Sequence, residues 1–349
     1  MTSQTSFGTL SEFLLQAGTE YFVIDVSRTR RFIDNQTFFD YETNKMPYAS
    51  PRQGNAWLCV VFWNKQLNQD HYMWFLKLPI DEQSLLMQAA RDQFLHIVTE
   101  ALGQQLQNIN EKRAQLPENP FVFIPNQQLL ADVNAMIRHH LNISRPEGAG
   151  RALNYLKAPN IQAWSELSVQ DISDLAITVH NEDVQAALLR HLEILPHPVC
   201  VCLCSSFEGI ELPSALIDAI LDYHQRCEQS VASMLLRSLA SSRTTEVDQY
   251  IRSLVSGDEV LDTETLIVIA GRHWQALSPE AQETSDSLSQ YFEKVAIAEP
   301  TYALFRGIFA DMVQIPALRV FLLAMIRDQR QSEMLKSAIS TLFDQRHNA

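Results

Sequence analysis

The pattern of the C-terminal half constrains the fold more than any other feature. From residue 151 onward, apolar residues recur at helical spacing in segments of about 12–18 residues, and strand-like alternation is absent. The breaks between these segments fall at Pro159, Pro196, Pro213, Gly257, Pro279, Pro300 and Pro316. We therefore predict that residues 151–349 form an array of helices that bury their apolar stripes against one another.

A short repeated motif suggests how the helices are organised. Leu-Leu-Arg-His-Leu at 188–192 recurs as Leu-Leu-Arg-Ser-Leu at 235–239, 47 positions later. That offset is in the range of helical-hairpin repeats of the HEAT kind. A looser copy at 304–308 follows after 69 positions and breaks the period. The pattern predicts a HEAT-like or an irregular helical-hairpin array, and it leaves both open.

The N-terminal part contains the clearest strand signal. Two apolar runs, 57–63 and 72–76, are separated by a polar stretch, which is typical of a hairpin. Both runs are continuously apolar instead of alternating, so we expect both faces of the hairpin to be covered, most simply by helices.

Shorter patterns complete this N-terminal module. The segments predicted as strands are 21–26, 31–33, 38–41 and 121–124, and the segments predicted as helices are 7–17, 81–102 and 129–137. Gly18 is expected to end the first helix and Asp81 to cap the second. The run from 143 to 150, which includes Pro146, Gly148 and Gly150, breaks the pattern. We predict an α+β chain with a small antiparallel sheet module at 1–142, a linker at 143–150 and a helical array at 151–349.

The charge of the chain disfavours nucleic acid as a partner. The formal net charge is −14, which repels a phosphate backbone unless a basic patch overrides it. The densest basic stretch is Arg28, Arg30 and Arg31, which we interpret as solvated charge between two strands, with an anion contact as the alternative.

Cysteine content and hydropathy indicate a cytoplasmic protein. The five cysteines lack the regular spacing of a disulfide framework, which favours a reducing compartment. The first residues do not resemble an export signal, and no uncharged apolar run reaches about 18 residues. We predict no membrane insertion.

One cluster of a histidine and cysteines is a candidate metal site. His197, Cys200 and Cys204 would share one helix face, with Cys202 pointing away and Cys227 further on, but they do not make a recognisable set of four metal ligands. Buried thiols that pack against a neighbouring helix are the expected alternative.

The remaining candidates have structural interpretations. His180 and His191 would lie on one face only if a single unbroken helix carried both. Residues 181–183 are expected to start a new helix between them, which argues against a shared face. Adjacent His139 and His140 suit a helix surface. Arg272 and His273 suit the negative end of a helix dipole. Phosphate-loop, nucleophile, zinc-pair and dinucleotide motifs are all absent from the sequence. We assign no catalytic, cofactor-binding or metal residue and predict no cofactor.

Two stretches carry a family resemblance. The run at 75–83, followed by 89–95, resembles an uncharacterised family of unknown function found in gammaproteobacteria, and so do 13–19 and 56–63. The likeness is specific over residues 7–100. It implies a bacterial cytoplasmic setting and transfers no site residue.

The favoured hypothesis is a non-enzymatic adaptor whose helical array binds a protein partner of unknown identity, as stacked helices commonly do. The alternative is an enzyme or small-ligand-binding protein with a cleft between the N-terminal sheet and the helical half. In that case Tyr21, Trp57, Trp63 and Trp74 would line the cleft. Nucleic-acid binding ranks third because of the charge.

Overall fold

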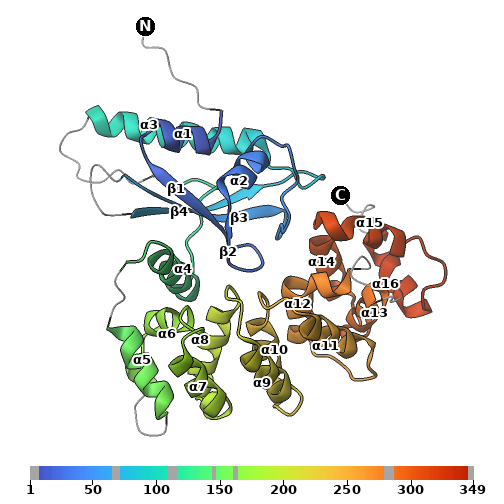
Figure 1. The fold of residues 1–349 in the computed structure, drawn as a ribbon. Helices are drawn as coiled ribbons and strands as arrows, with labels where there is room; N and C mark the ends of the chain where they lie inside the picture. The colour runs from blue at the N-terminus through green and yellow to red at the C-terminus, as the bar shows by residue number, and fades with distance from the viewer. Residues whose placement is uncertain are drawn as a thin grey trace. The chain divides into compact units, whose positions relative to one another are not determined.

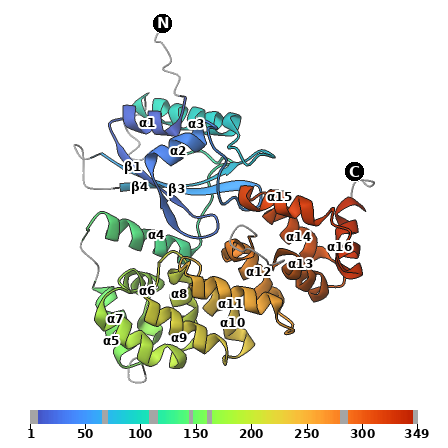
Figure 2. The same ribbon diagram turned by 45° about the vertical axis from the view of Figure 1, so that its right-hand side comes forward.

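The computed structural model describes residues 8–64, 71–107, 116–143, 147–159, 164–278 and 287–344 (Figures 1 and 2). The chain forms two compact units. One consists of Met1–Ile124 with Ala310–Val320, and the other of Pro125–Phe309 with Phe321–Ala349. The proposed linker at 143–150 stays a prediction.

The first unit is built around a four-stranded antiparallel sheet in the order β2-β1-β3-β4. Its strands are β1 (Glu20–Asp25), β2 (Arg31–Ile33), β3 (Asn55–Trp63) and β4 (His71–Pro79). The hairpin predicted at 57–63 and 72–76 is confirmed as β3 and β4, which pair from Asn55 with Pro79 to Trp63 with His71. The segment predicted as strand 121–124 pairs with β4 only through a bridge between Val122 and Leu76.

Three helices lie along one face of this sheet, α1 (Leu10–Gln16), α2 (Asn35–Glu42) and α3 (Gln88–Gln107) (Figure 1). Between the helices and the sheet lies an apolar core that includes Leu14, Phe38, Leu58, Leu76 and Phe94. The opposite face carries Ile24, Cys59, Val61 and Phe75, which are also buried. Both faces are therefore covered, which explains why β3 and β4 are continuously apolar.

The segment predicted as strand 38–41 is wrong: it belongs to helix α2. Asp34 caps this helix by accepting a hydrogen bond from the Thr37 amide at 2.9 Å. Phe38 and Tyr41, one turn apart, are both buried, so aromatic residues that favour strands here fill the core from a helix.

The predicted start of the next helix at Asp81 is also wrong, because α3 begins at Gln88. The Asp81 carboxylate instead accepts hydrogen bonds from the Gln83 and Leu85 amides and closes a turn. Ile80 and Leu86 then form a β-bridge, and the helix begins only after this bridge. The first helix, in contrast, ends as predicted at Gly18, whose φ is +70°.

The interpretation of Arg28, Arg30 and Arg31 as solvated charge is wrong for the first two, which are buried. Arg28 donates to the Pro51 carbonyl at 2.8 Å and pairs with the Asp311 carboxylate at 2.8 Å. Burial of this charge is tolerated because the guanidinium is paired and hydrogen-bonded.

Residues 310–320 join the sheet unit through further polar contacts. Asp311 also accepts from the Gln53 amide, and the Gln314 side chain accepts from the Gly54 amide at 2.7 Å. The Ser84 hydroxyl donates to the Gln314 carbonyl. A segment late in the sequence therefore completes the N-terminal unit.

The second unit is helical in all its described elements. Its α-helices, two of which also enter residues 310–320, are α4 (Gln127–His140), α5 (Gly148–Lys157), α6 (Val169–Ala176), α7 (Glu182–His191), α8 (His197–Phe207), α9 (Ser214–His224), α10 (Gln229–Ser238), α11 (Thr245–Ser256), α12 (Thr263–Arg272), α13 (Ser287–Ala298), α14 (Ala303–Met312), α15 (Pro316–Met325) and α16 (Glu333–Asp344). Short 3-10 helices lie at Trp164–Glu166, Leu192–Ile194 and Trp274–Leu277.

These helices pack in two layers. Helices α4, α6, α8, α10 and α12 contact one another in succession, and α5, α7, α9, α11 and α13 do the same (Figures 1 and 2). The two copies of the Leu-Leu-Arg motif fall on α7 and α10, which belong to different layers. The 47-residue offset therefore does not relate equivalent helices.

Buried polar side chains tie the helices of the first layer together. The Asp132 carboxylate of α4 accepts from the hydroxyls of Ser173 on α6 and Ser206 on α8, at 2.8 and 2.7 Å. Glu208, just after α8, is buried between Arg237 of α10 and Arg272 of α12. Buried polar groups that engage one another across helices favour one arrangement of these helices.

Candidate functional site

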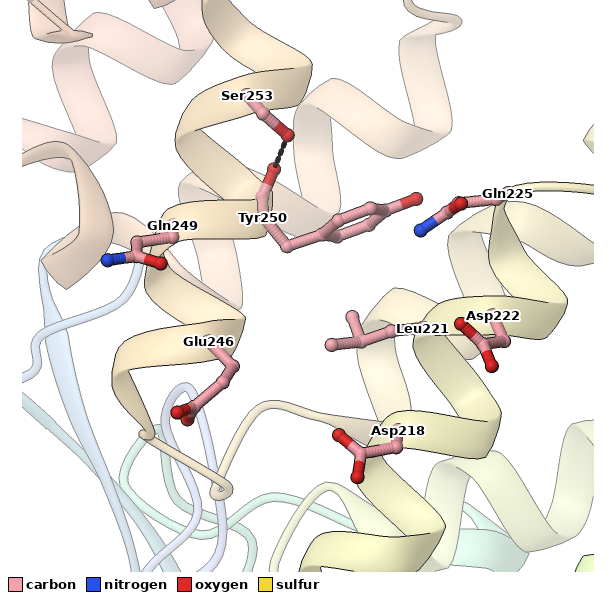
Figure 3. Close-up of a pocket in the computed structure, with 8 residues that line it drawn as sticks. All are labelled: Asp218, Leu221, Asp222, Gln225, Glu246, Gln249, Tyr250 and Ser253. Atoms are coloured by element: carbon pink, nitrogen blue, oxygen red, sulfur yellow. Dashed lines mark hydrogen bonds between the residues drawn. The ribbon is translucent and has the colours of Figure 1, made fainter.

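A groove between α9 and α11 is a candidate site in the helical unit. The two helices are neighbours in one layer, and the groove between them has a volume of about 610 Å³ (Figure 3). The residues that line it are Asp218, Leu221, Asp222, Gln225, Glu246, Gln249, Tyr250 and Ser253.

The sequence places these residues through helical periodicity. On each helix the four lining positions are spaced i, i+3, i+4 and i+7, which is one face over two turns. The other face of each helix is apolar and buried, as Leu216 and Ile220 show on α9 and Ile251 and Val255 on α11. Burial of these stripes fixes which side chains face the groove.

The charged groups of the groove lining are all acidic: Asp218 and Asp222 come from α9, and Glu246 comes from α11. Hydrogen bonds from its own backbone amide and from Thr244 hold the pKa of Glu246 below its usual value, so this carboxylate is charged at neutral pH. The lining residues include no lysine or arginine.

The apolar surface of the groove is held in a fixed position. The Tyr250 hydroxyl is hydrogen-bonded to His224 Nδ1 at 2.7 Å, and the two rings meet edge to face. Burial raises the pKa of Tyr250 to about 12 and lowers the pKa of His224. Both groups are therefore neutral at pH 7, and the Tyr250 ring faces Leu221 across the groove (Figure 3).

The lining offers carboxylate, amide and hydroxyl groups around a small apolar surface. The Ser253 hydroxyl donates to the Tyr250 carbonyl at 2.7 Å, and the lining contains neither a thiol nor an imidazole. An apolar surface bordered by carboxylates can hold a side chain that is both apolar and basic.

Two of the cysteine candidates are buried, whereas Cys202 and Cys227 are partly buried. Cys200 and Cys204 are buried on α8 with their sulfur atoms 3.9 Å apart, which confirms the prediction of buried thiols. Cys202 is only partly buried, and His197 is exposed at the start of the helix. In the part of the chain that the structure describes, no three His, Cys, Asp or Glu side chains are grouped to hold a metal ion.

The other histidines do not converge on a site. Asn181 caps α7, as expected, so exposed His180 and partly buried His191 lie on opposite sides of a helix start. His139 and His140 are exposed in the last turn of α4, which confirms a helix-surface position.

The prediction that Arg272 and His273 stabilise a helix end as cations is wrong for His273. This residue is 5% exposed and hydrogen-bonds through Nε2 to the Leu236 carbonyl at 2.8 Å. Burial, reinforced by the charge of Arg272, lowers its pKa to about 4, so the ring is neutral. Arg272 pairs with Glu208 at 3.4 Å.

The aromatic residues of the sheet unit have local packing partners. Tyr21 is in the core, whereas Trp57, Trp63 and Trp74 are partly buried. The Trp57 ring lies 4.2 Å from the guanidinium of Arg52, a cation–π contact. None of these four aromatic residues lines the groove.

The groove residues form no recognisable motif in the sequence. The one available signal was the combination of Asp218 and Asp222 around Leu221 on a single helix face, but it does not reveal which neighbouring helix supplies the second wall.

Fold and site together define an α+β protein whose two-layered helical unit presents an acidic groove. The chain belongs to DUF3549, a family described as a protein of unknown function, whose model matches residues 5–343. The match extends well beyond the residues 7–100 on which the resemblance rested. No curated protein and no solved structure matches the chain. Among the described residues, no helix combines the length and apolarity needed to cross a membrane.

Proposed function

We propose that this protein is a non-enzymatic adaptor that binds a segment of another protein in the groove between α9 and α11. The observation that carries the proposal is the groove itself: two turns of each helix expose acidic and polar side chains around the fixed Tyr250 ring. Grooves between packed helices are a common way to hold a peptide segment.

The two-layered helical arrangement supports the same function. Stacked helices with a HEAT-like or irregular succession commonly offer extended surfaces to partners. Exposed carboxylates along such a surface favour a protein partner over nucleic acid, since they repel phosphate. We also propose a cytoplasmic location, in keeping with the irregular cysteine spacing, and a gammaproteobacterial source on the family resemblance alone.

Site-specific photo-crosslinking tests the proposal. Benzoylphenylalanine replaces Gln249, an exposed lining residue, in the full-length chain, and Ser340, exposed on α16, in a matched control. In lysate of the source cells we expect one discrete adduct from position 249 and none from position 340. Ser253→Trp, which fills the groove, should abolish that adduct. Adducts of equal yield at both positions, or an adduct that survives Ser253→Trp, would contradict the proposal.

The alternative of an enzyme or ligand-binding protein with a cleft between the sheet and the helical half stays a hypothesis.

A further inference from the structure

The groove has two chemically different ends. Asp218 and Glu246 lie toward one end of the groove, and Gln225 and Ser253 lie toward the other (Figure 3). Leu221 and Tyr250 lie between the two ends (Figure 3). Asp218 and Gln225 are seven positions apart, which is about 10 Å along the helix. A bound segment therefore meets negative charge first and apolar surface about one helical turn later.

Three arginines lie near the groove, Arg226, Arg243 and Arg252, and Arg243, just before α11, acts together with Arg252 on Asp248. Arg226, just after α9, forms a two-pronged ion pair with Glu193, and Asp222 also acts on it. Arg252 on α11 donates to the Ala276 carbonyl at 3.1 Å. Asp222 thus acts on Arg226, whereas among the described residues no ion pair engages Asp218 or Glu246.

From this distribution we infer the chemistry of the partner, an inference that rests on the adaptor function proposed above. The groove binds a helical segment that carries Lys or Arg at one position and an apolar side chain three or four positions later. The cationic group lies between Asp218 and Glu246, and the apolar side chain packs on Leu221 and Tyr250. A helix fits best because its one-turn spacing matches the i, i+3, i+4 spacing of both walls.

Designed peptides test this inference without knowledge of the natural partner. The probes are three fluorescein-labelled, alanine-based helical peptides that carry Lys, Gln or Glu at one position and Leu four positions later. Fluorescence anisotropy measures their binding to the full-length chain at low and high salt. We expect the Lys peptide to bind, the Glu peptide to bind at least about tenfold more weakly, and added salt to reduce the difference.

Charge-matched variants of the protein complete the experiment. D218N/E246Q removes two charges from the groove, and E182Q/E333Q removes two exposed charges elsewhere in the helical unit. We expect about tenfold weaker binding of the Lys peptide by the first variant only. Circular dichroism confirms that both variants are folded.

The result that overturns the inference is equal binding of the Lys and Glu peptides, equal effects of the two variants, or no binding of any peptide up to millimolar concentration. If crosslinking at position 249 still yields a specific adduct, the adaptor function stands and only the basic partner is refuted. If both experiments fail, both proposals fall.

Discussion

Acidification should loosen helix α12 through the buried imidazole of His273. Burial lowers the pKa of His273 to about 4 in the folded protein, against about 6.5 in an unfolded chain. Protons therefore bind the unfolded state more strongly. The contribution to stability is constant above pH 6.5, falls as the pH drops from 6.5 toward 4, and changes no further below that value.

The size of the effect follows from this difference. One pKa unit corresponds to about 1.4 kcal/mol, so complete protonation of the unfolded state costs about 3 kcal/mol of stability. A pH of 5.0 lies about 1.5 units below the pKa of His273 in the unfolded chain. The loss of stability at this pH is therefore about 2 kcal/mol, or about thirtyfold in the opening equilibrium. The Leu236 carbonyl bonded to Nε2 limits the shift, and the charge of Arg272 reinforces it.

Hydrogen exchange measured by mass spectrometry can detect this change in α12. After correction for intrinsic rates, we expect the protection of amides in residues 263–272 to fall about thirtyfold between pH 7.5 and pH 5.0. In His273→Gln, which keeps a donor for the Leu236 carbonyl but does not titrate, the pH dependence should largely disappear. An equally steep loss of protection in the variant would refute the assignment to His273.

Two stability predictions follow from buried polar contacts. Asp311→Asn leaves the Arg28 guanidinium buried without its carboxylate, and we expect the sheet unit to lose about 2 kcal/mol of unfolding free energy. Urea denaturation measures this loss. A loss no larger than that caused by the exposed change Glu333→Gln would contradict the prediction. Ser206→Ala removes a donor to the buried Asp132 and should cost the helical unit about 1–3 kcal/mol, whereas an unchanged urea midpoint would show that the network adds nothing.

Local pattern was sufficient to predict most elements. The apolar runs of β3 and β4 and the spacing in α4 identify these elements because each is stabilised mainly by its own amphipathic or apolar surface. The pattern failed at residues 38–41, where strand-favouring aromatic residues occupy a helix that Asp34 caps. In that segment the cap and the shared core outweigh intrinsic β-propensity.

Long-range partners explain the remaining errors. The sequence around Arg28 predicts a solvated loop charge, because its partner Asp311 is 283 positions away in the sequence. The sequence around His273 predicts a cation at a helix end, because it does not reveal that Nε2 bonds to the Leu236 carbonyl. The groove likewise needs α9 and α11 as neighbours, although α10 separates them in sequence. Helical periodicity gives the exposed face of each helix but not the helix beside it.

Two of the groove carboxylates differ in what they contribute to their own helices. Glu246 lies in the first turn of α11, where the helix dipole favours an acidic residue. Asp218 lies in the second turn of α9, where that benefit fades, and it is four positions from Asp222. Like charges at this spacing destabilise a helix by about 0.2–0.5 kcal/mol.

Asp218→Asn should therefore raise stability slightly while weakening binding of the Lys peptide. Such an exchange of stability for function is expected where a charge is retained for recognition. Thermal unfolding and peptide anisotropy on the same variant measure both effects. A variant that is less stable than the wild type would instead identify Asp218 as a structural residue of α9.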